Sequence, residues 1–180
     1  MPESLAHDLR RTIRNVPDYP KKGILFRDIT PVLLDAPLLS RVVRTLAESI
    51  RPWRVDRLIG IEARGFIFGV PLAVELGVGF VPVRKKGKLP YRKLSAKYGL
   101  EYGTDEIEMH VDAVIKGHRV AVVDDLLATG GTAAAACELV RSSGGTVAGL
   151  AFVIELAPLR GREKLAGYEI RSLLTYDDEA

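Results

Sequence analysis

The pattern of hydrophobic and polar positions divides the chain into two unlike parts. Residues 4–16 and 38–50 place apolar side chains at helical intervals, so each is predicted to form an amphipathic helix. From residue 57 onward, short apolar runs alternate with helix-like segments. The runs lie at 57–61, 79–83, 119–123 and 146–154, and the helix-like segments lie at 66–76 and about 131–143. Strands that are apolar along their whole length are typical of a parallel sheet with helices on both faces, so the pattern predicts an open, doubly wound, mostly parallel α/β protein.

Two segments interrupt this alternation. Pro17, Pro20 and Gly23 predict a turn-rich connector that leads into a short strand at 24–26. Residues 84–112 form a long polar stretch that opens with the letters RKKGK and contains no acidic residue before Glu101. Such an excursion inside a compact domain is typical of a functional loop. A solvated hairpin arm is the alternative.

Length and composition narrow the class of protein. The chain has 180 residues, of which 47% are hydrophobic and 27% charged, and these values indicate one soluble globular domain. A net charge of +3 is too small to indicate nucleic-acid binding but leaves an anionic ligand open. Residues 65–83 carry only one charge, yet their prolines and glycines favour a buried helix and strand over a membrane span. The single cysteine, Cys137, fits a reducing cytoplasm and reads as a small buried hydrophobe.

The most specific chemical signal is the run VVDDLLATGGT at residues 122–132. A predicted strand delivers Asp124 and Asp125 at its carboxyl end, where ligands bind in open α/β sheets, and a small-residue loop then leads into a helix whose first N–H groups favour a phosphate. The run lacks the lysine of a Walker A loop, and the chain lacks a Gly-x-Gly-x-x-Gly fingerprint. We therefore expect Thr129, Thr132 and the loop backbone to hold a phosphate, while the two acids accept sugar hydroxyls or hold a metal. A strand–turn–helix connection with a capping aspartate is the structural alternative.

This run resembles the phosphoribosyl-diphosphate motif of the type I phosphoribosyltransferases, and residues 122–138 are similar to the version found in the adenine-specific branch. Further matches follow in the order expected for that family. They are residues 17–31 (a base-binding hood), 60–66 (GIEARGF, a pyrophosphate loop), 84–90 and 100–103 (a mobile catalytic loop) and 161–165 (GREKL, near the C-terminus). The resemblance implies a type I phosphoribosyltransferase fold in a single domain over residues 1–180. Its expected parts are an N-terminal helix and hood at about 1–35, a core at about 36–180, and a long mobile loop at about 84–106.

The resemblance implies that adenine and phosphoribosyl diphosphate are converted to AMP and pyrophosphate, a step of purine salvage. It also implies Mg²⁺ bound with phosphoribosyl diphosphate and held mainly by that substrate rather than by a dedicated set of protein ligands. The family is usually homodimeric, with the interface near the active site. No nucleic-acid or membrane partner is expected, and the expected location is the cytoplasm.

The chemistry of this reaction assigns roles to the basic residues. Displacement of pyrophosphate develops negative charge on the leaving group, which arginine and lysine side chains stabilise. Arg64, Arg84, Lys85 and Lys88 are therefore expected to contact the pyrophosphate. Arg92, Lys93 and Lys97 make the loop more basic than the family pattern requires. They either tighten pyrophosphate binding or are simply solvated.

The remaining site residues take their roles from the resemblance. Phe26 and Leu126 would sandwich the purine ring, and backbone groups of Leu25 and Arg27 would read its edge. The phosphate and ribose would lie against Asp124, Asp125, Ala128, Thr129, Gly130, Gly131 and Thr132.

A positioned carboxylate also has to accept the proton that the base loses. Glu101 is expected to do so, with its neighbour Tyr102 orienting or covering the site and Arg64 completing the catalytic set.

Two alternatives remain open at this level. The enzyme could use another purine base, such as hypoxanthine, guanine or xanthine. A regulator that senses phosphoribosyl diphosphate belongs to a different class, but it should carry a DNA-binding module, for which the first 16 residues are too short.

Overall fold

The structure is a computed structural model that describes residues 4–100 and 103–177. Its strands are β1 (Arg14–Pro17), β2 (Leu25–Asp28), β3 (Arg57–Ile61), β4 (Gly79–Lys85), β5 (Lys93–Leu100), β6 (Gly103–His110), β7 (Arg119–Leu127), β8 (Thr146–Leu156) and β9 (Ile170–Tyr176). Its helices are α1 (Leu5–Thr12), α2 (Thr30–Leu34), α3 (Ala36–Ile50), α4 (Arg64–Leu76), α5 (Gly131–Ser142) and α6 (Gly161–Lys164), with 3₁₀ turns at Arg51–Trp53 and Ala157–Leu159.

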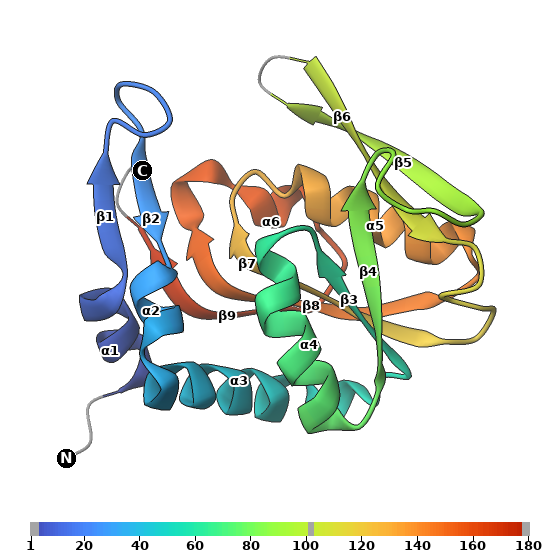
Figure 1. Ribbon diagram of the computed structural model, residues 1–180, viewed down its shortest axis with the longest axis horizontal. Coiled ribbons are helices and arrows are strands. Elements are labelled where there is room, and N and C mark those ends of the chain that lie inside the picture. Colours follow the sequence, from blue (N-terminus) through green and yellow to red (C-terminus); the bar gives the residue numbers. More distant parts are fainter. Residues whose placement is uncertain (1–3, 101–102, 178–180) are drawn as a thin grey trace.

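Seven strands form one twisted sheet in the order β5-β6-β4-β3-β7-β8-β9 (Figure 1). The five strands from β4 to β9 in that order pair in parallel, and β6 joins β4 and β5 antiparallel. The predicted mostly parallel α/β sheet is confirmed. An antiparallel hairpin at one edge completes it.

Helices cover both faces of the sheet, and the strand residues alternate between two cores. Leu58 and Val123 face the core under α3 and α4, whereas Ile59 and Val122 face the core under α5. All four side chains are fully buried. This alternation explains why the central strands read as continuous apolar runs, because both of their faces are covered.

The N-terminal segments fold into a separate small layer, which we call the hood and define as α1, β1, β2 and α2. The helix predicted over residues 4–16 is too long, because α1 ends at Thr12 and Ile13 is already extended. Arg14–Pro17 instead pairs antiparallel with Leu25–Asp28. Pro17 contributes to this outcome, since the residue before a proline disfavours the helical region.

The polar stretch at 84–112 is mostly paired rather than open. β5 and β6 form an antiparallel hairpin with continuous register from Lys93↔His110 to Leu100↔Gly103. The expectation of a long loop is therefore wrong for residues 93–100 and 103–106, where ladder hydrogen bonds satisfy the backbone, and the hairpin alternative holds there. Whether this arm moves stays a prediction.

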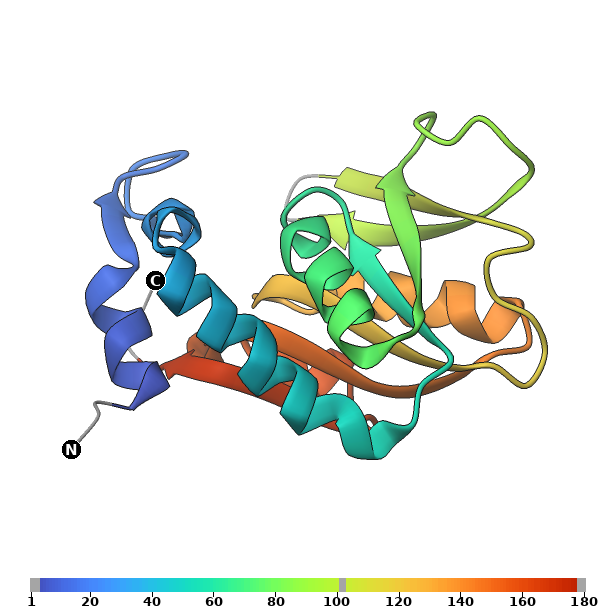
Figure 2. The same ribbon diagram turned by 60° about the horizontal axis from the view of Figure 1, so that its bottom comes forward.

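The hood and the hairpin stand at opposite ends of the molecule, on either side of the carboxyl ends of the central strands (Figures 1 and 2). Among the described residues, no helix combines the length and the apolar character needed to cross a membrane. The cytoplasmic location stays a prediction.

Candidate active site

The paired acids lie inside a strand rather than after it. β7 continues through Asp124 and Asp125 to Leu127, so both acids lie near the carboxyl end of the strand, where their carboxyl groups interact with each other. Burial raises the pKa of the Asp124 carboxyl well above 3.8, and the negative charge of Asp125 raises it further. Burial also raises the pKa of Asp125, against the opposing effect of Arg64. A ligand that brings positive charge or hydroxyl donors to this pair therefore stabilises its ionised form.

The loop after β7 forms a small cup, which we call the phosphate loop (residues 128–131). Gly130 has φ +76°, a left-handed conformation that glycine adopts without strain, and α5 begins at the next residue. A cavity of about 80 Å³ lies in this cup, lined by Asp124, Leu126, Leu127, Ala128, Thr129, Gly130, Gly131, Thr132, Ala133 and Phe152. All seven residues predicted to contact the phosphate and ribose lie here, Asp125 beside the cavity and the other six in its lining.

Arg64 begins α4 and faces the acid pair. Its Nε lies 2.8 Å from Asp125 Oδ2, and its side chain remains 42% exposed, so the guanidinium is accessible to a ligand. The next residue, Gly65, lets the start of α4 approach the acid pair closely, because a Cβ at this position would lie only 2.9 Å from Asp124 Oδ1. The structure thus brings together the predicted catalytic arginine and the predicted ribose site.

The other predicted pyrophosphate cations, Arg84, Lys85 and Lys88, lie at the end of β4 and in the following turn, which we call the basic turn (residues 84–88). A glutamate that the sequence interpretation had not singled out, Glu62, gathers them. Its two oxygens accept Arg84 Nε at 3.3 Å and Nη2 at 3.1 Å, Lys88 Nζ at 3.1 Å and the Lys85 N–H at 3.0 Å. Arg84 Nη1 also donates to the Lys88 carbonyl at 3.1 Å, so Arg84 mainly shapes the turn.

The other two amines of the basic turn, those of Lys85 and Lys86, pair with acidic residues of the hairpin. Lys85 Nζ lies 3.4 Å from Asp105 Oδ2, which also accepts the Tyr98 hydroxyl at 2.9 Å. The Tyr98 ring and the Gly99 carbonyl lie against Gly131 at the start of α5. Tyr98 therefore connects the basic turn to the phosphate loop. In the sequence, the only sign of this role is that Tyr98 is an aromatic residue within a basic segment.

The hood contributes the residues expected to hold the base. The Phe26 ring centroid lies 5.5 Å from the Arg64 guanidinium carbon and 5.2 Å from the Tyr19 ring, in an edge-to-face contact. Arg27 is buried, with its guanidinium 3.9 Å above the Tyr176 ring, so it anchors the hood to β9. Only one edge of β2 is paired in the described sheet, and its other edge leaves backbone groups for a ligand.

Two sets of expected roles stay untested, and the expectation for Cys137 is confirmed. Glu101 and Tyr102 lie outside the described residues, so their roles stay predictions. Leu126 lines the phosphate-loop cavity, but its partnership with Phe26 around a purine also stays a prediction. Cys137 is buried, and burial raises the pKa of its thiol to about 12, which makes it an unreactive core residue.

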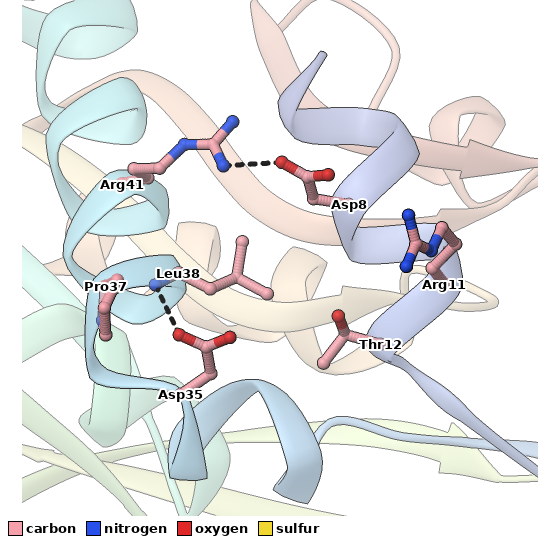
Figure 3. A pocket seen from close by; sticks show the side chains of 7 residues that line it. All are labelled: Asp8, Arg11, Thr12, Asp35, Pro37, Leu38 and Arg41. Atoms are coloured by element: carbon pink, nitrogen blue, oxygen red, sulfur yellow. Dashed lines mark hydrogen bonds and ion pairs between the residues drawn. The ribbon is translucent and has the colours of Figure 1, made fainter. Parts of the chain in front are cut away.

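A larger hollow lies away from these groups, between α1 and the start of α3 (Figure 3). It has a volume of about 420 Å³ and is lined by Asp8, Arg11, Thr12, Asp35, Pro37, Leu38 and Arg41. Arg41 pairs with Asp8, and Asp35 caps α3 by accepting the Leu38 N–H at 3.0 Å. The Arg41–Asp8 pair joins the hood to the core, and none of the lining residues belongs to the site above.

Comparison with known proteins decides the family. The family model of the phosphoribosyl transferase domain matches residues 32–174. The adenine phosphoribosyltransferase of Clostridium botulinum (strain Loch Maree) is 54% identical over 170 residues, which cover 94% of this chain and 99% of the relative. The chain belongs to the adenine phosphoribosyltransferase family. An adenine phosphoribosyltransferase of Clostridium perfringens (strain SM101) is 56% identical over 169 residues, covering 94% and 98%.

Solved structures of adenine phosphoribosyltransferases share the fold closely. The enzyme of Thermoanaerobacter pseudethanolicus superposes with a TM-score of 0.93 at 54% identity, covering 95% of this chain and 99% of that one. The Saccharomyces cerevisiae enzyme, solved with adenine and an imino-altritol bisphosphate, gives 0.89 at 41% identity, with coverage of 94% and 98%. The chain is thus a transferase of purine salvage that forms AMP, and the alternatives of another purine base or a regulator are not favoured.

Proposed function

We propose that the described site transfers the 5-phosphoribosyl group from phosphoribosyl diphosphate to adenine, with the residue roles given below. The observation that carries the proposal is the position of Arg64, which lies between three parts of the site. It pairs with Asp125 of the ribose site and lies over Phe26 of the hood. It also follows Glu62 of the pyrophosphate side by two residues in the same loop. One side chain therefore sits where base, sugar and leaving group must meet.

The 5′-phosphate binds in the phosphate loop. The first N–H groups of α5 have no partner within the helix and point into the cup, and the hydroxyls of Thr129 and Thr132 add donors. Asp124 and Asp125 accept the ribose hydroxyls, which stabilises their ionised form. The sugar is thereby held with C1′ toward Arg64.

The leaving pyrophosphate is stabilised by Arg64, Lys85 and Lys88. Arg64 keeps exposed guanidinium donors, and the two lysine side chains are more than half exposed. Arg84 holds the turn in shape through Glu62 and the Lys88 carbonyl. Preorganised positive groups at the position where charge develops lower the barrier without rearranging during the reaction.

Adenine enters between the hood and β7. Phe26 supplies the apolar face, and the unpaired edge of β2 offers the backbone groups of Leu25 and Arg27 to the edge of the purine. Glu101 is assigned as the base that accepts the proton from adenine, with Tyr102 beside it, on the strength of the sequence alone. The Saccharomyces cerevisiae relative, solved with adenine, supports a purine in this family's site.

Magnesium is expected to bind with phosphoribosyl diphosphate. The donor set fits this cation, since Mg²⁺ favours one or two carboxylates together with substrate phosphates, and Asp124 and Asp125 offer such carboxylates at the ribose site. When bound, Mg²⁺ neutralises part of the diphosphate charge. In the described part of the chain, no group of three or more histidine, cysteine or acidic side chains forms a metal cluster, and the two acids would act together with the substrate.

A homodimer is also part of the proposal. Ile67, Val70 and Val74 are exposed along one side of α4, and they continue into a groove shared with Leu39 and Val43 of α3. We call these five residues the apolar face. Exposed apolar patches of this kind mark contact surfaces. Because Arg64 begins the same helix, a second copy seated here would lie next to the active site, as the family resemblance implies.

The decisive experiment measures AMP formation from adenine and phosphoribosyl diphosphate, with Mg²⁺ and after its removal by chelation. We expect turnover that requires Mg²⁺ and that exceeds the rate with hypoxanthine, guanine or xanthine by at least about 100-fold, because unpaired polar groups penalise the wrong base. Faster turnover of hypoxanthine would overturn the assignment of the base. Undiminished turnover without Mg²⁺ would overturn the cofactor proposal.

A further inference from the structure

Glu155 is a buried carboxylate that the division of labour above leaves unused. It lies on β8, beside the strand that carries the acid pair, and is 5% exposed. Its two oxygens accept Arg162 Nε at 2.6 Å and Arg162 Nη2 at 2.7 Å, and one of them also accepts the Ser172 hydroxyl at 2.8 Å. The hydrogen bonds from Arg162 outweigh the effect of burial and lower the pKa of Glu155. The carboxylate is therefore ionised at neutral pH, and both of its oxygens accept hydrogen bonds.

The residue next to Arg162 lies directly against the phosphate loop. A Cβ on Gly161 would lie 2.2 Å from the Ala128 carbonyl oxygen, and a Cβ on Gly130 would lie 2.5 Å from the Gly161 carbonyl oxygen. Neither backbone has room for a side chain, so Gly161 is in direct contact with the loop at Ala128 and at Gly130. A displacement of the Gly161 backbone would therefore also displace Ala128 and Gly130.

We propose that Glu155 and Arg162 are positioning residues that set the shape of the phosphate loop, and through it the affinity for the 5′-phosphate. The inference rests on the proposed function, because it takes residues 128–131 as the 5′-phosphate site. The pair touches no substrate. It fixes Gly161, which in turn supports the backbone whose N–H groups face the phosphate.

The geometry of the pair explains why arginine is needed. A guanidinium fork binds a carboxylate through two parallel hydrogen bonds and fixes both distance and orientation, whereas a lysine ammonium is a single point charge. The contact between Gly161 and the phosphate loop tolerates little displacement, since misplacement by about 1 Å can cost two orders of magnitude in function.

The test compares two ligands that report on opposite ends of the substrate. Ribose 5-phosphate probes the phosphate loop, and pyrophosphate probes the basic turn. Their dissociation constants are measured by calorimetry for the wild type, Glu155→Gln and Arg162→Lys, together with KM for adenine. Glu163→Gln is the matched control, because Glu163 forms an exposed ion pair with Arg160 beside the same short helix.

We expect Glu155→Gln and Arg162→Lys each to weaken ribose 5-phosphate about tenfold, leaving pyrophosphate affinity and KM for adenine within about twofold. Glu163→Gln should change neither. Equal weakening of both ligands would show a general structural role and overturn the inference, as would no change. If Glu155→Gln does not fold, Arg162→Lys decides alone, because it keeps the charge and removes only the fork.

A further variant separates this inference from the proposed function. Thr132→Ala removes a hydroxyl of the phosphate site itself and should also weaken ribose 5-phosphate. If Thr132→Ala has no effect, the site assignment is wrong and the inference falls with it. If Thr132→Ala weakens binding and the Glu155 and Arg162 variants do not, only the inference is overturned.

Discussion

At the scale of single residues, one carboxylate organises the basic turn. Partial burial alone would raise the pKa of Glu62, but hydrogen bonds from Arg84, the Lys85 N–H and Lys88 outweigh it and lower the pKa to about 2. The Lys88 amine and the turn that carries Lys85 are thus held in place by this carboxylate before any ligand binds. Long flexible side chains lose conformational entropy when they are ordered. Because Glu62 already orders Arg84 and Lys88 in the free protein, less entropy is lost when the ligand binds.

Replacing Glu62 should reveal this through pH. A carboxyl whose pKa falls from 4.5 to about 2 on folding contributes up to about 3 kcal/mol at neutral pH, and this contribution declines as the pH falls from about 5 toward 2. Denaturant unfolding should therefore find Glu62→Gln less stable than the wild type at pH 7, with a smaller difference at about pH 3.5. A difference that stays constant between these pH values would contradict the assigned pKa. Glu163→Gln, which breaks an exposed ion pair with Arg160, is the control.

Which site residues the sequence could predict depends on how local their signal is. Asp124 to Thr132 follow one another along the chain, and the strand–loop–helix pattern alone brings them together. Glu62, Tyr98 and Glu155 act through contacts with residues 7 to 26 positions away, and no local pattern predicts such pairs.

At the scale of elements, the hairpin is the part that links the two halves of the substrate site. Tyr98 on β5 donates to Asp105 on β6, and its hydroxyl also interacts with that of Thr132. The β5 strand packs against α5, so the hairpin lies over the start of the phosphate-binding helix. From the sequence, a hairpin was only the alternative to a loop here, because a polar edge hairpin with many charged residues resembles an irregular polar loop.

Removing the Tyr98 hydroxyl should loosen this link. One hydrogen bond contributes about 1 kcal/mol, so Tyr98→Phe should raise KM for phosphoribosyl diphosphate about fivefold and leave KM for adenine nearly unchanged. Because a looser cover admits water, hydrolysis of phosphoribosyl diphosphate without adenine should also rise. Steady-state kinetics with both substrates varied provide the measurement. Tyr91→Phe, at an exposed tyrosine before β5, is the matched control; equal kinetics in the two variants would refute the role of Tyr98.

At the scale of the whole molecule, the central sheet is what the sequence predicts best. All four apolar runs are strands, because burial on both faces leaves one clear pattern. The short strand predicted at 24–26 corresponds to β2, whereas β1 and β9 were missed, since they are short or half-covered and their polarity is mixed. The apolar face of α3 and α4 was likewise hidden, because exposed and buried valines look the same in a sequence.

A charge placed on the apolar face should separate the proposed dimer. Val74 belongs to the apolar face and is 78% exposed, so Val74→Glu would bury a charge in the proposed dimer interface. The particle mass should therefore fall to that of one chain at micromolar concentration. Light scattering after size exclusion provides the measurement. Ile115→Glu, at an apolar side chain that is 55% exposed elsewhere, should leave the mass unchanged. A wild type that is already monomeric would exclude the dimer.

The hairpin has one more consequence, which concerns solubility. β5 is the outermost strand of the seven-stranded sheet, and an uncovered edge strand invites pairing with another chain. Lys93 and Lys97 lie on this strand, and only Lys93 has a buried partner, Glu108 at 2.9 Å. Charged side chains on an edge make strand addition unfavourable. We therefore expect Lys93 and Lys97 to hinder edge-to-edge aggregation of the enzyme at high concentration, independently of any role in substrate binding.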